Sequence, residues 1–359
     1  MTNEENAAKV VAEQAESLHT FDGYLAKAQS DTADDSEAQQ TQAAIQVARR
    51  VAEEFPNLNQ TLRAASKLPA YQIDVDYTSD PTSLVDRMCN LEVSPRTIVR
   101  ALYGHGLMSL ADGKSDEAIQ DAIAILNWSR HVAAQPLLIN YLVATACYGI
   151  GIDLSTRCLM ADGVTTDDRV ALLNSLSSES TLRDHFDRAF DTERAFGVSS
   201  FASFPGSRFR YMLGELGAFL DTSAEFESFA RQPTGLAPKQ PAKQSLFGDV
   251  SWQAQRQALV AFRRNQALTR AVRILAAWKA TGQKAEANLS DLALSEPVTT
   301  DPFSGSPMRF KVSGNAIFVY SVGENLIDDN GEIISGGDIG IQATESDRGT
   351  ESDEGTGSL

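Results

Sequence analysis

The sequence predicts a mainly α-helical protein that ends in a small antiparallel β unit. Three observations predict this fold. Apolar residues recur at helical spacing through most of the chain, an uncharged stretch lies near its middle, and Gly/Asp-rich turns gather between Asp301 and Ile341. Apolar residues make up 42% of the 359, enough for a substantial core, and a chain of this length is expected to form two domains.

The first third of the chain is rich in predicted helix. Apolar residues from Ala44 to Phe55 follow the i, i+3, i+4, i+7 stripe, and Pro56 ends it. Between Tyr71 and Tyr77 apolar and polar residues alternate, which predicts a short extended segment with one face in water. Four carboxylates in and after this segment could form a cation site or a solvated edge: Asp74, Asp76, Asp80 and Asp86. The solvated edge is favoured, because alternation alone explains their spacing.

Two adjoining helices are predicted in the centre, 94–112 and 115–134, with Ser115 as the cap of the second. The interval 106–118 resembles one tetratricopeptide-type helical hairpin, without a second copy at a period of about 34 residues. The domain is therefore expected to be either tetratricopeptide-like or an irregular bundle. Further helices are predicted at 136–160, 166–175, 180–196 and 209–229, with a loop at 197–207.

The longest uncharged stretch is Val132 to Ile152, and two interpretations are open. Its length could span a bilayer. Its polar residues Gln135 and Asn140, with ordinary amphipathic helices on both sides, favour a central buried helix instead.

A stretch rich in Pro, Gln and Lys follows the helical region and predicts a linker at 233–250, so the helical domain covers 1–232. The next helix, 251–281, has an apolar stripe from Leu268 to Trp278. Arg263, Arg270 and Arg273 lie on the opposite side of this helix. No acidic residue occurs between Ser251 and Ala285, which favours docking of the helix against the acidic body or, alternatively, an anionic partner.

The end of the chain predicts a β-hairpin. Met308, Phe310 and Val312 alternate with basic residues to give one strand, and 317–322 gives the other after a tight turn. An Asp-rich loop follows and closes at Asp338. The last 17 residues, 343–359, hold five acidic residues and one Arg and are expected to form a disordered acidic tail, which leaves 251–342 as a helix, hairpin and loop unit.

This terminal unit resembles the C-terminal region of the major pseudopilins of type II secretion systems. Those proteins carry a helix, Asp-Pro-aromatic, Gly-x-Pro, a hairpin ending in Tyr-Ser-x-Gly, and a loop ending in Asp-Ile. The matching residues are Asp301, Pro302, Phe303, Gly305, Pro307, Tyr320, Ser321, Gly323, Asp338 and Ile339. The whole chain also resembles uncharacterised bacterial envelope proteins that join a helical domain to this ending.

The resemblance implies a calcium site in the loop, carried most directly by Asp338, with Asp328, Asp329 and Asn325 as further ligands. Oxygen-rich loops with glycine bends suit the six to eight oxygen ligands of Ca²⁺. The alternative is a loop held by its own turns and by hydrophobic contacts, since Leu326, Ile327, Ile333 and Ile334 lie within it.

Charge and targeting limit the partners. The net charge of −17 argues against a nucleic acid, because phosphate binding needs concentrated Lys and Arg. A protein partner or self-association is expected. The N-terminal residues are polar, so membrane association is expected only through a segment missing from this chain. The resemblance implies a location in the cell envelope or periplasm. A cytoplasmic location is expected instead if no upstream signal exists.

The residues therefore favour a non-enzymatic binding or scaffold protein, and the resemblance implies that it is associated with the cell envelope and carries a pseudopilin-like C-terminal module. Four scattered histidines show no H-x-x-x-H spacing, and Cys89, Cys147 and Cys158 show no metal spacing and are expected to be buried thiols. The alternative is a hydrolase or other enzyme with its site in a cleft of the helical domain. A deep pocket with converging His, Asp or Glu would favour the enzyme, and a shallow concave helical face would favour binding.

Overall fold

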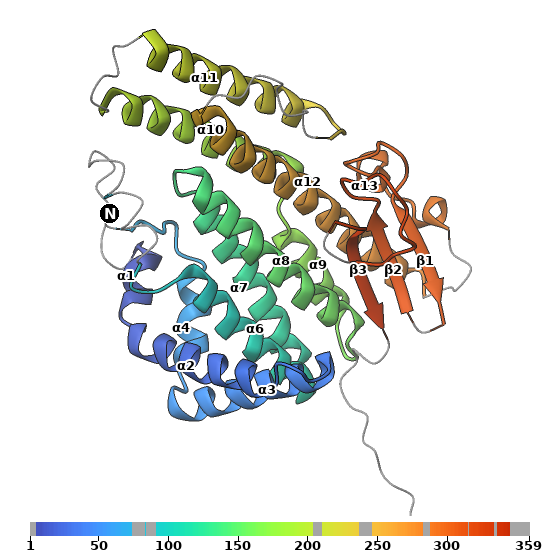
Figure 1. Cartoon of the computed structure of the whole chain (residues 1–359). Helices are drawn as coiled ribbons and strands as arrows, with labels where there is room; N and C mark the ends of the chain where they lie inside the picture. The colour runs from blue at the N-terminus through green and yellow to red at the C-terminus, as the bar shows by residue number, and fades with distance from the viewer. Residues whose placement is uncertain are drawn as a thin grey trace, which may run out of the picture.

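A computed structural model describes residues 5–73, 83, 91–203, 210–236, 246–282, 288–314, 316–333 and 336–344. The fold is mainly helical with a small antiparallel sheet at the C-terminal end, as the sequence predicts (Figure 1). The helices are α1 Ala7–Ala12, α2 Ala15–Asp31, α3 Glu37–Glu54, α4 Leu58–Ala65, α6 Pro95–Ala111, α7 Ser115–Ala133, α8 Leu138–Met160, α9 Thr166–Ser175, α10 Glu179–Ser203, α11 Arg210–Arg231, α12 Leu246–Ala280 and α13 Glu296–Thr299, with a 3₁₀ turn, η2, at Leu289–Leu292. The strands are β1 Arg309–Ser313, β2 Ala316–Ser321 and β3 Ile339–Thr344.

Local sequence explains several helix starts. Ser36 and Gln39 form a capping box at the start of α3, and Thr165 and Asp168 form another at the start of α9. Each box satisfies two backbone N–H groups that have no partner within the helix. Ser94 caps α6, whose first residue is Pro95. The expected cap at Ser115 is wrong: this residue is the first of α7, and its hydroxyl donates to the carbonyl of Asp162 instead, at 3.2 Å.

Helix α8 lies at the centre of the fold. It packs against α6, α7 and α12, and α2 and α3 lie below this group in Figure 1 while α10 and α11 lie above it. In the part of the chain that the structure describes, α8 is the one helix long and apolar enough to cross a membrane, and 50% of its most apolar window is buried. Cys147 and Cys158 on α8 are free, buried thiols as predicted, and Cys89 lies outside the described residues.

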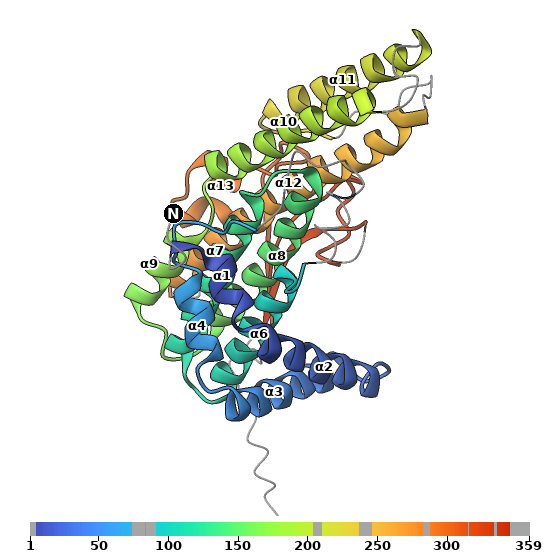
Figure 2. The same ribbon diagram turned by 90° about the vertical axis from the view of Figure 1, so that its left-hand side faces the viewer.

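Helix α12 connects the helical part to the sheet. It begins at Leu246, within the predicted linker, and runs for 35 residues. One continuous apolar cluster contains Ile152 of α8, Leu268 of α12 and Val319 of β2. A second, aromatic cluster joins α8, α10, α11 and the first half of α12. In Figure 2, α10 and α11 lie side by side along this half of α12.

The terminal sheet has three strands in the order β1-β2-β3, and both neighbouring pairs are antiparallel. The predicted hairpin is β1 and β2. The third strand was missed, and Ala343 and Thr344, which the sequence analysis placed in the tail, belong to it. The signal was present, because Ile339, Ile341 and Ala343 alternate with smaller or polar residues. Residues 345–359 of the predicted tail lie outside the described residues.

Two other predictions need correction or fall outside the structure. The loop predicted from residue 197 is wrong as far as Ser203, because α10 continues to that residue. A Cβ on Gly197 would meet the ring of Phe219 at 2.5 Å, so this glycine allows α10 and α11 to approach closely rather than forming a turn. Ala70, just before the predicted extended segment, forms an isolated bridge with Asn6, and residues 71–73 of the segment form no strand. The four carboxylates predicted for a solvated edge or a cation site lie outside the described residues: Asp74, Asp76, Asp80 and Asp86.

Candidate functional site

The Asp-rich loop holds its predicted metal residues in different environments. Asp338 is 1% exposed, and its Oδ2 accepts from the backbone N–H of Gly331 at 2.8 Å. Its other oxygen, Oδ1, is buried without a hydrogen-bond partner among the described residues. Burial raises the pKa of Asp338, and the charges of Asp328 and Asp329 raise it further.

The other three residues bond within the loop or to the sheet. Asp328 forms an ion pair with Arg309 at 3.0 Å and accepts from the hydroxyl of Tyr320 at 3.0 Å. The amide of Asn325 donates to Asp329 at 3.0 Å. Among the residues that the structure describes, no three or more His, Cys, Asp or Glu side chains are grouped as a metal site. Asn325 and Asp329 are thus bonded to each other, and Asp338, which bonds Gly331, lies close enough to Asp328 and Asp329 for their charges to raise its pKa.

Asp301, the acid of the Asp-Pro-aromatic motif, organises the turn before the sheet. Its Oδ1 accepts from the backbone N–H of Phe303 at 2.8 Å and from the hydroxyl of Ser321 at 2.7 Å. Its Oδ2 accepts from the backbone N–H of Val322 at 3.0 Å. This carboxylate is 1% exposed and therefore joins the turn to the end of β2. Asp301 and Ser321, two residues that carry the resemblance, thus have a structural role.

A buried polar cluster lies between α4, α6 and α7. Asp121 is fully buried and bonds Arg63 at 2.6 Å and Nδ1 of His105 at 2.7 Å. Ser109 lies 3.4 Å from the same Nδ1. A serine nucleophile and its orienting acid must contact opposite nitrogens of the histidine ring, whereas these two share one nitrogen. The cluster therefore connects three helices and does not have the geometry of a nucleophile–base pair.

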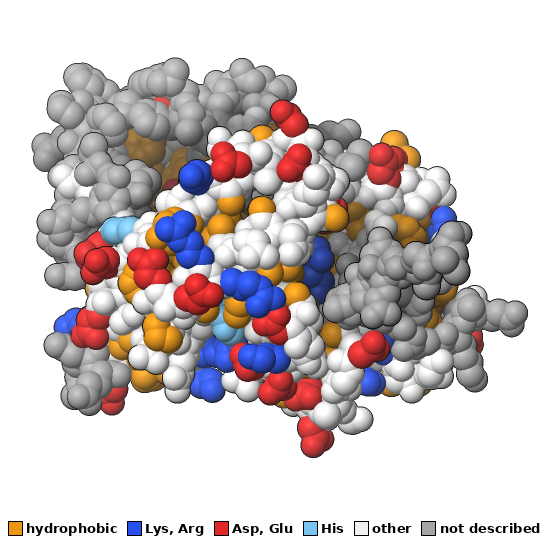
Figure 3. Space-filling view, turned by 90° about the horizontal axis from the view of Figure 1, so that it is seen from below, with side chains coloured by type: hydrophobic (Ala, Val, Ile, Leu, Met, Phe, Trp, Pro, Cys, Tyr) orange, Lys and Arg blue, Asp and Glu red, His pale blue; other side chains and the backbone are white. Residues whose placement is uncertain are grey.

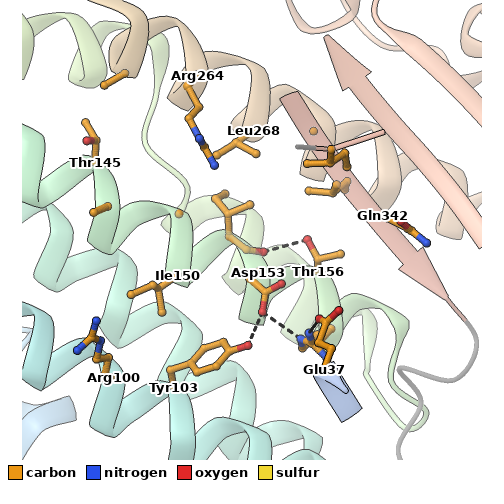
Figure 4. A pocket seen from close by; sticks show the side chains of 18 of the residues that line it. Glu37, Arg100, Tyr103, Thr145, Ile150, Asp153, Thr156, Arg264, Leu268 and Gln342 are labelled. Atoms are coloured by element: carbon orange, nitrogen blue, oxygen red, sulfur yellow. Dashed lines mark hydrogen bonds and ion pairs between the residues drawn. The ribbon is translucent and has the colours of Figure 1, made fainter. Parts of the chain in front are cut away.

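The candidate site is a groove of about 1100 Å³ that the sequence analysis did not predict. Its walls come from α2, α3, α6, α8, α12 and β3, and Ile333 of the Asp-rich loop reaches it. Ile150 of α8 and Val260 and Leu268 of α12 supply apolar surface. Figure 4 shows the open space between α8, α12 and β3. The volume exceeds that of typical small-molecule pockets, about 300–1,000 Å³.

Cations dominate the charge of this groove. Its lining includes Arg100, Arg157, Arg256 and Arg264, against the two carboxylates Glu37 and Asp153. Arg256 is paired with Glu324, and Arg157 with Glu37 and Asp153. Arg100 of α6 and Arg264 of α12 are exposed, and neither has a carboxylate partner among the described residues. Figure 4 shows Arg264 extending from α12 toward α8, with Arg100 on the far side.

A chain of polar contacts closes the lower end of the groove in Figure 4. The hydroxyl of Tyr103 donates to Asp153 at 2.6 Å, and Arg157 donates to the same oxygen at 3.0 Å. Arg157 also lies 3.7 Å from Glu37 of α3. Burial, followed by the charge of Asp153, raises the pKa of Tyr103, which further favours the protonated phenol as the donor to Asp153. The chain joins α3, α6 and α8 at one end of the groove.

The arginines of the groove differ from those singled out in the sequence. Arg263 and Arg270, expected on the face of the helix opposite its apolar stripe, are buried. Arg263 donates to the carbonyls of Phe229, Gln232 and Pro233, so it caps the end of α11 and holds the start of the predicted linker. Arg270 pairs with Glu179 at 2.9 Å. Docking against the protein's own groups therefore accounts for these two arginines.

On the face shown in Figure 3, acidic and basic side chains are interspersed, with no single-sign patch over the described part. The excess of arginine in the groove is therefore a local feature of a chain with net charge −17. Comparison with known protein families, curated proteins and solved structures finds no match.

Proposed function

We propose that this protein is a non-enzymatic binding or scaffold protein whose groove receives an anionic segment of a partner protein. The observation that carries the proposal is the pair Arg100 and Arg264, two cations on facing helices without carboxylate partners among the described residues. Carboxylates form bidentate hydrogen bonds with guanidinium groups, so acidic side chains match both arginines.

The size and surroundings of the groove favour a protein partner. A space of about 1100 Å³ holds several residues of a peptide. Leu326, Ile327 and Ile333 of the Asp-rich loop are 45%, 60% and 38% exposed, and Ile333 lines the groove itself. Ile333 therefore adds exposed apolar contact area to the charged groove, as protein interfaces need.

The lining also favours binding over the alternative of an enzyme. The described residues that line the groove include no histidine or cysteine. Asp153 is hydrogen-bonded to Tyr103 and Arg157, and Glu37 faces Arg157 with its side chain 88% exposed. Both carboxylates are thus engaged with Arg157 at one end of the groove, an arrangement that fits joining helices better than proton transfer.

The test is a selection of random decapeptides on the immobilised protein, followed by fluorescence anisotropy of the selected peptides. We expect enrichment of Asp and Glu, and at least a tenfold loss of affinity in the double variant Arg100→Glu/Arg264→Glu. The matched control is Lys67→Glu/Lys311→Glu, which changes the net charge equally at two exposed sites outside the groove. Selected peptides without acidic enrichment, or equal affinity for both double variants, would overturn the proposal.

Calcium binding by the Asp-rich loop is a second proposal, supported by the buried, unpaired Oδ1 of Asp338. Of the four predicted ligands, Asp338 has a buried oxygen without a partner among the described residues, whereas Asp328 pairs with Arg309 and Asn325 bonds to Asp329. A bound cation would relieve the repulsion that helps to raise the pKa of Asp338. Calorimetry with millimolar Ca²⁺ should show heat and a thermal shift that Asp338→Asn removes. No heat and no shift in the unmodified protein would end the idea.

An envelope or periplasmic location also remains a proposal, supported by the pseudopilin-like sequence motifs of residues 301–339. Antibody detection in separated periplasmic, membrane and cytoplasmic fractions of the source cells tests it. Recovery in the cytoplasmic fraction alone would contradict it.

A further inference from the structure

We infer that the groove binds its partner in an extended conformation, as an added strand on β3, and that the bound segment alternates acidic and apolar residues. This inference rests on the proposed function and specifies the kind of ligand that the groove accepts.

The first observation is the position of β3 in the sheet. Among the described strands, β3 pairs with β2 alone, so it forms one edge of the sheet. Gly340, Ile341, Gln342 and Thr344 of this edge strand line the groove. An edge strand presents backbone N–H and C=O groups on its outer side, and a partner in extended conformation can bond them by strand addition.

The second observation is the length of the wall that α8 supplies. Helix α8 lines the groove from Thr145 to Arg157, which spans about 18 Å at a rise of ~1.5 Å per residue. An extended chain rises about 3.3 Å per residue, so five to six residues of a partner fit along this wall. The lining part of β3, Gly340 to Thr344, has a comparable length, about 13 Å.

The third observation is the chemistry that faces such a segment. Arg256, Val260, Arg264 and Leu268 follow one another at four-residue intervals on α12, so one helix face presents both arginine and aliphatic side chains to the groove. Ile150 of α8 adds to the apolar part. Side chains of an extended segment point alternately to two sides. A segment that alternates acidic and apolar residues can therefore pair with the arginines on one side and pack against the aliphatic side chains on the other.

Room for this segment is kept at Gly149. A Cβ on this glycine would meet nothing within 4 Å, although the residue lies in the middle of the central helix and lines the groove. A larger side chain here would fill part of the groove without displacing a neighbour. Gly23 of α2 is an equally open helical glycine outside the lining, so it provides a matched control.

The experiment uses the acidic peptides selected on the intact protein. Each backbone amide of one such peptide is N-methylated in turn, which removes one hydrogen-bond donor and leaves the side chain unchanged. Strand addition predicts that every second position within a run of five or six loses at least tenfold in affinity while the positions between change little. Amide exchange should slow at least tenfold in the complex at the alternate residues within 340–343 whose N–H groups point away from β2.

Two further variants complete the test. Gly149→Leu should weaken peptide binding at least tenfold, whereas Gly23→Leu should leave it unchanged. Thermal unfolding of both variants confirms that each is folded. A flat N-methyl scan, or unchanged exchange on binding at those alternate residues within 340–343, would overturn the extended mode. If the peptide depends on Arg100 and Arg264 but shows a flat scan, the proposed function stands and this inference fails. If no selected peptide depends on the two arginines, the proposed function itself fails.

Discussion

Helix α12 carries neighbouring arginines that have opposite surroundings. Arg263 is 1% exposed and donates to three backbone carbonyls at the end of α11 and just beyond it. Arg264, the next residue, is exposed in the groove and has no carboxylate partner among the described residues. Successive helical residues are turned by about 100° from each other, so the two side chains leave the helix on different faces.

The difference shows how an arginine that stabilises the fold can be distinguished from an arginine that is available to bind a ligand. Burial lowers the pKa of Arg263 to about 10, which reflects the free energy of removing its charge from water. The carbonyls of Phe229, Gln232 and Pro233 offset that penalty. Arg264 is hydrated and contributes little to folding. Its position on the same groove-lining side of α12 as Arg256 is explained better by a role in ligand binding than by a role in folding stability.

The largest expected effect tests this contrast directly. Arg263→Met should lower the free energy of unfolding by about 3 kcal/mol, because three partly buried backbone carbonyls lose the charged group that donates to them. Arg264→Met, the matched variant, should change the free energy of unfolding by less than about 0.5 kcal/mol. Urea unfolding followed by circular dichroism measures both. Equal losses in the two variants would show that Arg264 also stabilises the fold.

A second comparison uses glycine, where charge plays no part. A Cβ on Gly106 of α6 would lie 2.5 Å from Leu154, a fully buried residue of α8, whereas a Cβ on Gly149 meets open space. We expect Gly106→Ala to destabilise by about 1–2 kcal/mol through overpacking, after a partial offset by the better helix propensity of alanine. Gly149→Ala should stabilise by about 0.5–1 kcal/mol. A loss of stability in Gly149→Ala would mean that the groove closes around this position in solution.

The helices of the central region could be predicted from the sequence, because periodicity and end signals agree there. The bounds predicted for α6, α7 and α9 lie within about two residues of those observed. The prediction failed where one residue type has two uses. Gly197 was interpreted as part of a loop, but it allows close packing of α10 on Phe219. The sequence does not predict the strand β3, because the Asp-rich loop before it has the composition of a terminal loop.

The groove could not be predicted for a physical reason. Its walls come from segments that are distant in the sequence, from Phe21 of α2 to Thr344 of β3, and no local pattern links them. Sequence places Arg263 opposite the apolar stripe and does not single out Arg264, because the packing of α11 against one face of α12, which buries Arg263, has no local signal. The acid of the Asp-Pro motif, by contrast, was recognised from local wording, and Asp301 organises its own turn.

The smallest expected effect is on stability, and it comes from neutralising one carboxylate in each of two ion pairs. One pair joins α10 to α12, and the other lies at the groove. Glu179 pairs with Arg270, whose side chain is 7% exposed, and Glu37 lies 3.7 Å from Arg157 with its own side chain 88% exposed. Glu179→Gln should lower the free energy of unfolding by about 1 kcal/mol, less than the cost of breaking a fully buried pair because Glu179 is 44% exposed. Glu37→Gln should have no measurable effect on stability.

Peptide affinity distinguishes the same two variants in the opposite order. Glu37→Gln removes one of the two carboxylates that line the groove, so an acidic peptide should bind about twofold to threefold more tightly. Glu179→Gln leaves the groove lining unchanged and should leave affinity unchanged. Chemical denaturation and anisotropy on the same samples give both readouts. If Glu37→Gln weakens binding of the acidic peptide, the partner must instead contact Glu37 through a cation, and the assignment of the groove as an acceptor of acidic segments would need revision.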